Sequence, residues 1–244
     1  MEKLWKYIIC SSAFVLAAMV LAAAYTSSSR SEGTISVTGL GETQFASDMI
    51  VVEGEFSVKN DAAADGYIEL ENQRKRVLSH LVSNGVSEES ISFNMPTARE
   101  VFESVYVDGK YIGETSNGFI LRQSFIVESM EVDAVEAASR KLPSLMAEGI
   151  MVEVYEPMYY FTKLESVKHD LIGAAAADAR ARAELMATNA GSSLGKLISS
   201  RAGVFQITAA TGDEEFSAGG SFNLSSRVKK ARVTVRAEFK VKNN

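Results

Sequence analysis

The clearest alternation of apolar and polar residues lies near the C-terminus. The apolar positions are Ala231, Val233, Val235, Ala237, Phe239 and Val241, and the polar positions between them are Lys230, Arg232, Thr234, Arg236, Glu238, Lys240 and Lys242. Successive side chains of a β-strand point to opposite faces of the sheet. The pattern therefore predicts a long strand with one buried face and one solvated face.

An earlier strand and helix show the two periods that distinguish these structures. Apolar residues and Gly54 alternate over Ile50–Val58, which predicts a strand. Asn60-Asp61 then precedes a helical pattern that closes at Asn84-Gly85, so we expect an N-cap at the first pair and a helix end at the second.

The middle of the chain predicts two strands joined by a tight turn. Residues 91–107 are expected to be extended, with a bend at Pro96. Asp108-Gly109 tolerates the positive φ angles of a two-residue hairpin turn, and residues 119–127 continue the return strand.

A second helix and another strand follow. Ser129 is expected to cap a helix with Val132, Val135, Ala138 and Leu142 as its buried stripe, and Gly149 follows its end. Residues 150–161 are expected to form one strand. The order from Ile50 to Phe161 is therefore β-α-β-β-α-β, the split βαβ arrangement.

The remaining elements flank this core. Ile35–Gly39 predicts a short strand, with a turn bracketed by Gly39 and Gly41. An Ala-rich helix ends at Gly191, His169 is expected to open it, and residues 197–207 predict another strand. The predicted fold class is α+β: an antiparallel sheet with a split β-α-β-β-α-β core, a third, Ala-rich helix and C-terminal strands, with the helices packed on the sheet.

The Ala-rich segment Ala174–Gly191, followed by Ser192-Ser-Leu-Gly-Lys196, resembles the A-x-x-D-A-r-x-r-A-x-x-(L/M)-A hallmark of the SIMPL-domain (YggE-like) family of bacterial envelope proteins. Val37-Thr-Gly39-Leu-Gly41-Glu42 is similar to the start of the family pattern, whereas Ser47-Asp48 stands where the family usually has Pro-Asp. The resemblance implies export, a general link to oxidative-stress defence, ring assembly in some members and no agreed catalytic centre.

The N-terminus predicts the compartment. Lys3 and Lys6 precede an apolar run over residues 7–25, which suits either a signal peptide cleaved near Ala24 or an uncleaved inner-membrane anchor. We therefore divide the chain into a signal peptide or anchor (1–25), a short tether (26–33) and a SIMPL-like domain (34–244). Both alternatives place the domain in the periplasm or elsewhere outside the cytoplasm.

Composition narrows the function further. A net charge of −6 argues against a nucleic-acid-binding surface. The single cysteine, Cys10, lies in the N-terminal run, so the domain can form neither a disulfide nor a thiolate metal site. His80 and His169 lack a His-x-x-x-His or cysteine partner. We therefore expect no catalytic residue, metal or cofactor.

Two features are candidates for partner binding. An acidic loop over residues 211–223 contains two aromatic residues, which either contact a partner or fold back on their own domain. The cationic row of the last strand either meets an acidic partner or anionic lipid, or is an ordinary solvated face. The candidate residues are Phe216, Phe222, Lys230, Arg232, Arg236 and Lys240.

The sequence thus favours a non-enzymatic envelope protein that self-associates or binds an envelope partner, with membrane attachment if the N-terminal segment stays uncleaved. The alternative is a periplasmic small-ligand-binding protein or hydrolase. Its starting point would be a stacking pocket formed by Tyr106, Tyr111, Tyr155, Tyr159 and Tyr160.

Overall fold

The computed structural model describes residues 11–22, 33–211 and 217–243. The chain divides into two compact units. The first comprises Met1–Gly41, Ile172–Gly203 and Thr234–Asn244, and the second comprises Glu42–Leu171 and Val204–Val233. Three of the four boundaries fall within long elements, namely β1 (Thr34–Ala46), α4 (Leu164–Asn189) and β11 (Val228–Asn243). The fourth lies between Gly203 and Val204, outside any helix or strand.

A six-stranded antiparallel sheet forms the body of the second unit. Its strands are β2 (Met49–Asn60), β3 (Ile91–Phe93), β4 (Thr97–Val107), β5 (Lys110–Ser129), β6 (Met151–Val154) and β7 (Met158–Tyr160). The order is β3-β5-β2-β6, with β4 also on β5 and β7 also on β2. The predicted α+β class and the split β-α-β-β-α-β order are confirmed.

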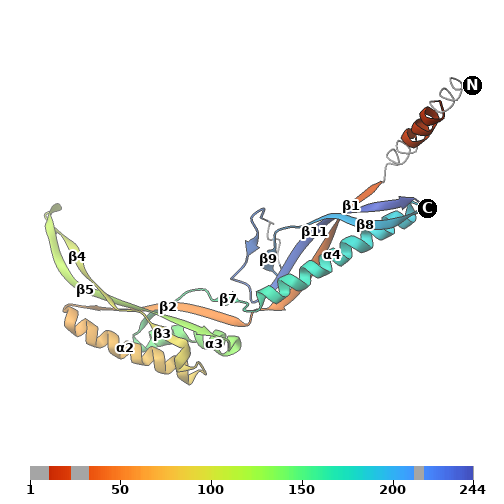
Figure 1. Ribbon diagram of the computed structural model, residues 1–244. Coiled ribbons are helices and arrows are strands. Elements are labelled where there is room, and N and C mark those ends of the chain that lie inside the picture. Colours follow the sequence, from red (N-terminus) through yellow and green to blue (C-terminus); the bar gives the residue numbers. More distant parts are fainter. Residues whose placement is uncertain (1–10, 23–32, 212–216, 244) are drawn as a thin grey trace, which may run out of the picture. The chain divides into compact units, whose positions relative to one another are not determined.

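The core of the second unit lies between this sheet and the helices α2 (Ala63–Ser83) and α3 (Val132–Ser139). Alternate residues of β2 and β5, such as Phe56 and Phe125, are fully buried together with Leu70 and Val77 of α2. Figure 1 shows α2 running along the sheet. The apolar residues whose alternation predicted these strands thus form the face of the sheet that the helices cover.

The helix starts differ from the predicted caps. Ala62, which has no side-chain cap, precedes α2, and Asn60 Oδ1 accepts the Ala62 N–H at 3.1 Å. Ser129 ends β5, and its Oγ accepts the N–H of Glu131, the residue before α3, at 3.0 Å. Both side chains therefore stabilise the turn that leads into a helix, and the predicted N-caps were wrong.

The second predicted helix is also shorter than expected. The α-helix ends at Ser139, and a 3₁₀ helix, η2 (Leu142–Glu148), follows it. Pro143 in the first turn of η2 has no N–H to extend the α-helical hydrogen bonds. The predicted stripe from Val132 to Leu142 is nevertheless buried throughout.

The Asp108-Gly109 hairpin is confirmed. Both residues have positive φ angles, 51° and 75°, and Val107 pairs with Lys110. The two strands continue as a two-stranded ribbon in Figure 1.

Two predicted strands are each divided in the structure. Residues 150–161 form β6 and β7, separated at Glu156-Pro157, where the proline cannot donate to a ladder. Residues 197–207 belong to β8 (Ser192–Ala202) and β9 (Gln206–Ala209), which pair with different parts of β11.

In the first unit, α4 packs on β1 and β11 through a narrow seam of alanines. Ala175, Ala179, Ala183 and Ala187 are fully buried at every fourth position. Because α4 begins at Leu164, His169 lies in its second turn and does not open the helix.

The expected turn at Gly39 and Gly41 is wrong, because β1 is continuous from Thr34 to Ala46. A Cβ on Gly39 would lie 2.1 Å from the Ala175 carbonyl oxygen and 2.4 Å from the Ala179 nitrogen. The glycine therefore serves the close approach of helix and strand.

Residues 11–22 are helical. Among the described residues, no helix is long and apolar enough to cross a membrane. Residues 1–10 and 23–32, which hold the rest of the expected signal peptide or anchor and nearly all of the tether, lie outside the described ranges.

Candidate functional site

The polar row of β11 is the first candidate surface, and its predicted alternation is confirmed. Ala231, Val233, Val235, Ala237 and Phe239 are buried, whereas the residues between them are partly or fully exposed. The cationic side chains nevertheless have different surroundings in the two units.

In the second unit, Lys230 and Arg232 share one carboxylate. Arg232 Nε donates to Glu42 Oε2 at 2.7 Å, and Lys230 Nζ lies 3.5 Å from Glu42 Oε1. The hydrogen bond from Arg232, helped by the charges of both cations, holds the pKa of Glu42 below its ordinary value. The charges of Lys230 and Arg232 are therefore largely neutralised by Glu42 within their own unit.

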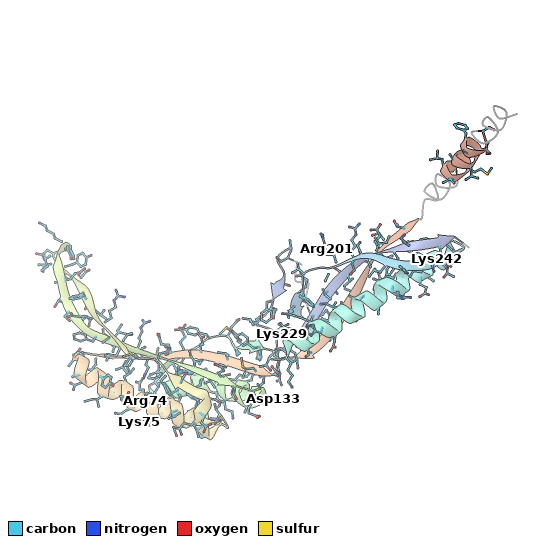
Figure 2. The ribbon with its side chains drawn as sticks, viewed as in Figure 1. Arg74, Lys75, Asp133, Arg201, Lys229 and Lys242 are labelled. Atoms are coloured by element: carbon cyan, nitrogen blue, oxygen red, sulfur yellow. The ribbon has the colours of Figure 1, made fainter. Side chains whose placement is uncertain are left out.

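In the first unit, Arg236 lines a groove of about 400 Å³. Its Nε donates weakly to Ser36 Oγ at 3.4 Å, and Arg201 of β8 is its direct cross-strand partner. Lys240 follows farther along the same face and is exposed. Figure 2 labels Arg201 on this part of the sheet.

The structure describes only one of the two candidate phenylalanines, Phe222. Phe222 lies in β10 (Ser221–Phe222), which pairs in parallel with β9, and its side chain is 48% exposed. Phe216 lies outside the described residues. An exposed ring on a short strand keeps Phe222 a candidate contact residue.

One buried cation was missed by the sequence reasoning. Lys229 is 1% exposed, and its Nζ donates to the carbonyl oxygens of Asn223 and Ser226, each at 2.6 Å. Lys229 lies two residues before Ala231 and four before Val233, so its side chain points to the same inward face. The alternation of the strand was therefore the signal in the sequence for its burial. The ammonium group ties the 223–226 loop to the strand.

The structure separates the five tyrosines proposed as a pocket. Tyr106 and Tyr111 form an edge-to-face pair at the hairpin, with ring centroids 5.7 Å apart. Tyr155 and Tyr159 line a different cleft, of about 310 Å³, beside α3.

Charged groups surround Tyr159 in that cleft. Arg227 Nη1 lies 2.6 Å from Asp133 Oδ1 and 3.3 Å from Glu136 Oε2. Burial, followed by the nearby Glu136 charge, raises the pKa of Tyr159, whereas Arg227 lowers the pKa of Asp133. These contacts link α3 to the loop before β11.

The histidines occupy different elements. His80 lies in the last turn of α2, and His169 lies on α4. Among the described residues, no three His, Cys, Asp or Glu side chains gather as a metal site would require.

Comparison with known proteins gives a family. A family model for SIMPL, described as a protein of unknown function (DUF541), matches residues 35–241. No curated protein matches the chain. The matched range includes the sheet of the second unit, the alanine seam of α4 and nearly all of β11. This chain therefore belongs to the SIMPL (DUF541) family.

Proposed function

We propose that this chain is an exported, non-enzymatic envelope protein that acts by self-association or by binding an envelope protein partner. The observation that carries the proposal is the outer edge of β8. Within the described ranges, β8 pairs with β11 alone, so its other edge presents backbone N–H and C=O groups for pairing.

The side chains of β8 favour pairing with another chain. Residues 196–202 are all exposed, and Leu197 and Ile198 are 53% and 47% exposed. Monomeric proteins usually protect a long edge strand with charges, prolines or a covering loop. Lys196 and Arg201 also lie on β8, but the adjacent exposed aliphatic residues Leu197 and Ile198 between them favour an interface.

The thin core of the first unit supports the same proposal. Its buried cluster comprises Val37, Ala179, Ala183, Ala237 and Phe239, so α4 contributes little more than methyl groups. Burial of apolar surface contributes roughly 25 cal/mol per Å². A second chain against β8 would add the apolar burial that this unit otherwise lacks.

The link to oxidative-stress defence that the family resemblance implies is proposed here as indirect. Cys10 is the only cysteine in the sequence, so the rest of the chain has no thiol for peroxide to oxidise.

Light scattering after size-exclusion chromatography tests the proposal on the chain from Thr26 onward. We expect a discrete oligomer that the double substitution Leu197→Lys/Ile198→Lys converts to a smaller species, because lysines block edge pairing. Leu185→Lys, on the exposed side of α4, is the matched control and leaves the assembly intact. A wild-type monomer that also captures no envelope protein would refute the proposal.

A small-ligand-binding protein or hydrolase is the second candidate. It is favoured by a groove of about 680 Å³ on the second unit, whose lining includes Arg99, Phe102, Ile120 and Arg122. A thermal-shift screen against metabolites and metals tests this candidate: a reproducible rise with one ligand class supports it, and the absence of any shift counts against it.

A further inference from the structure

The groove on the first unit contains two arginines placed directly opposite each other. Arg236 of β11 and Arg201 of β8 are partners in the antiparallel ladder, so their side chains leave the sheet on the same face. Like charges at directly opposed positions destabilise a sheet. This pair therefore needs a compensating interaction or tolerates its own repulsion.

No carboxylate in the described part of the chain pairs with either guanidinium. The hydrogen bond from Arg236 to Ser36 Oγ is long, at 3.4 Å. Other arginines on these sheets are matched: Arg232 pairs with Glu42 and Arg122 pairs with Glu55. The two groove arginines thus retain donors directed to solvent.

The rest of the lining is suited to an oxyanion. Ser36 and Ser199 line the groove on the same face as the two arginines, whereas Ser200 and Ala237, which also line it, are cross-strand partners at the alternate positions. Hydroxyl groups donate to phosphate oxygens, and a planar guanidinium can bind two of those oxygens at once. The volume of about 400 Å³ exceeds what one phosphate group occupies.

From these contacts we infer that the Arg201–Arg236 groove is a binding site for a phosphate group. The bound anion would lie between the two guanidinium groups and cancel their repulsion, with serine hydroxyls as additional donors. This site goes beyond self-association at the edge of β8.

The carboxylate of Glu238 is expected to lower the affinity of the groove for phosphate. It also lines the groove, two positions from Arg236 on the same face, and pairs across the ladder with Ser199. Its carboxylate repels an anion, so removal of this charge by Glu238→Gln should tighten phosphate binding.

Two sources could supply the phosphate group: a soluble phosphate or the headgroup of an anionic lipid. Isothermal titration of the full-length chain with inorganic phosphate tests the soluble source. Flotation with phosphatidylcholine vesicles, with and without phosphatidic acid, tests the lipid source. The difference between the two vesicle types removes any contribution of the apolar N-terminal run.

The variants are Arg201→Gln, Arg236→Gln and, as a matched control, Lys242→Gln. The Lys242→Gln substitution removes one positive charge from the same face of β11, near the C-terminal end of the strand (Figure 2). We expect saturable binding that each arginine substitution weakens about tenfold, because each removes a charge-assisted pair. The control should change binding less than about twofold.

Saturation by inorganic phosphate identifies a soluble ligand, and an increment that appears only with phosphatidic acid identifies a headgroup. Circular dichroism establishes that each variant is folded. The inference is overturned if neither form binds, or if Lys242→Gln weakens binding as much as the arginine variants, which would indicate diffuse charge attraction.

Discussion

At the scale of single residues, Glu42 joins two cations of β11 to β1 in the second unit. Its folded-state pKa is lowered, so its contribution to stability is present above the unfolded-state pKa and is lost as pH falls through the folded-state value. Glu42→Gln should cost about 0.5 kcal/mol at pH 7, a small value because solvent screens the pair. Urea unfolding at pH 7 and pH 3 measures the cost, which should largely vanish at pH 3; an equal cost at both pH values would contradict the ion-pair assignment.

Gly39 is the residue whose role differs most from its predicted one. Gly39→Ala should destabilise the protein by about 3 kcal/mol, because the new methyl group would collide with the α4 backbone. Gly173→Ala is the matched control in α4: its Cβ meets nothing within 4 Å, so it should stabilise the helix by about 0.5–1 kcal/mol. Thermal unfolding of both variants decides the matter. Equal effects of the two substitutions would show that β1 and α4 do not approach so closely.

At the scale of elements, Asp178 connects α4 to β1. Its Oδ2 accepts the Leu40 N–H at 2.8 Å and pairs with Arg182 Nε at 2.9 Å, which explains the aspartate in the Ala-rich hallmark. The Leu40 hydrogen bond is the main cause of the lowered pKa of Asp178. Asp178→Ala should therefore lower the melting temperature at pH 7, and the difference should shrink as pH falls below the ordinary aspartate pKa.

Differential scanning calorimetry at several pH values tests this expectation, with Glu184→Ala on the same helix as the control. Within the described ranges Glu184 contributes only its backbone carbonyl, which accepts a hydrogen bond from the Thr188 hydroxyl, so its side chain should be dispensable. If the two alanine variants behave alike, the link through Leu40 does not stabilise the first unit.

Local patterns predicted most elements because their causes lie within a few residues. The alternation over Ala231–Val241 and the Asp108-Gly109 turn are of this kind, and both are confirmed. The continuity of β1 through Gly39 depends on α4, whose contacting residues lie far along the chain, so no local pattern could reveal it. Gly203, directly after β8, shows a similar close approach, because a Cβ on it would lie 2.6 Å from Thr234 Oγ1 of β11.

The candidate site was less predictable than the fold for a related reason. The sequence predicted the cationic row of β11. It did not predict that the two parts of the row have different surroundings: Glu42 neutralises the part with Arg232, whereas Arg201 adds positive charge next to Arg236. Both partners lie on other strands. Charge pairing across a sheet depends on register, and register is set by contacts between distant segments.

At the scale of the whole molecule, the SIMPL match spans both compact units. The second unit has a well-filled core of aromatic and branched residues, whereas the first buries mainly alanines, valine and Phe239. We therefore expect the first unit to gain most from association with another chain.

Hydrogen exchange of the β8 backbone amides tests the central proposal most directly. If β8 pairs with a second chain or an envelope partner, its outward amides should exchange slowly in the assembled protein and rapidly in Leu197→Lys/Ile198→Lys. The protection of the β11 amides against exchange should be the same in both proteins and serves as the internal reference. Equally rapid exchange of these amides in both proteins, under conditions where the wild type is assembled, would contradict the account.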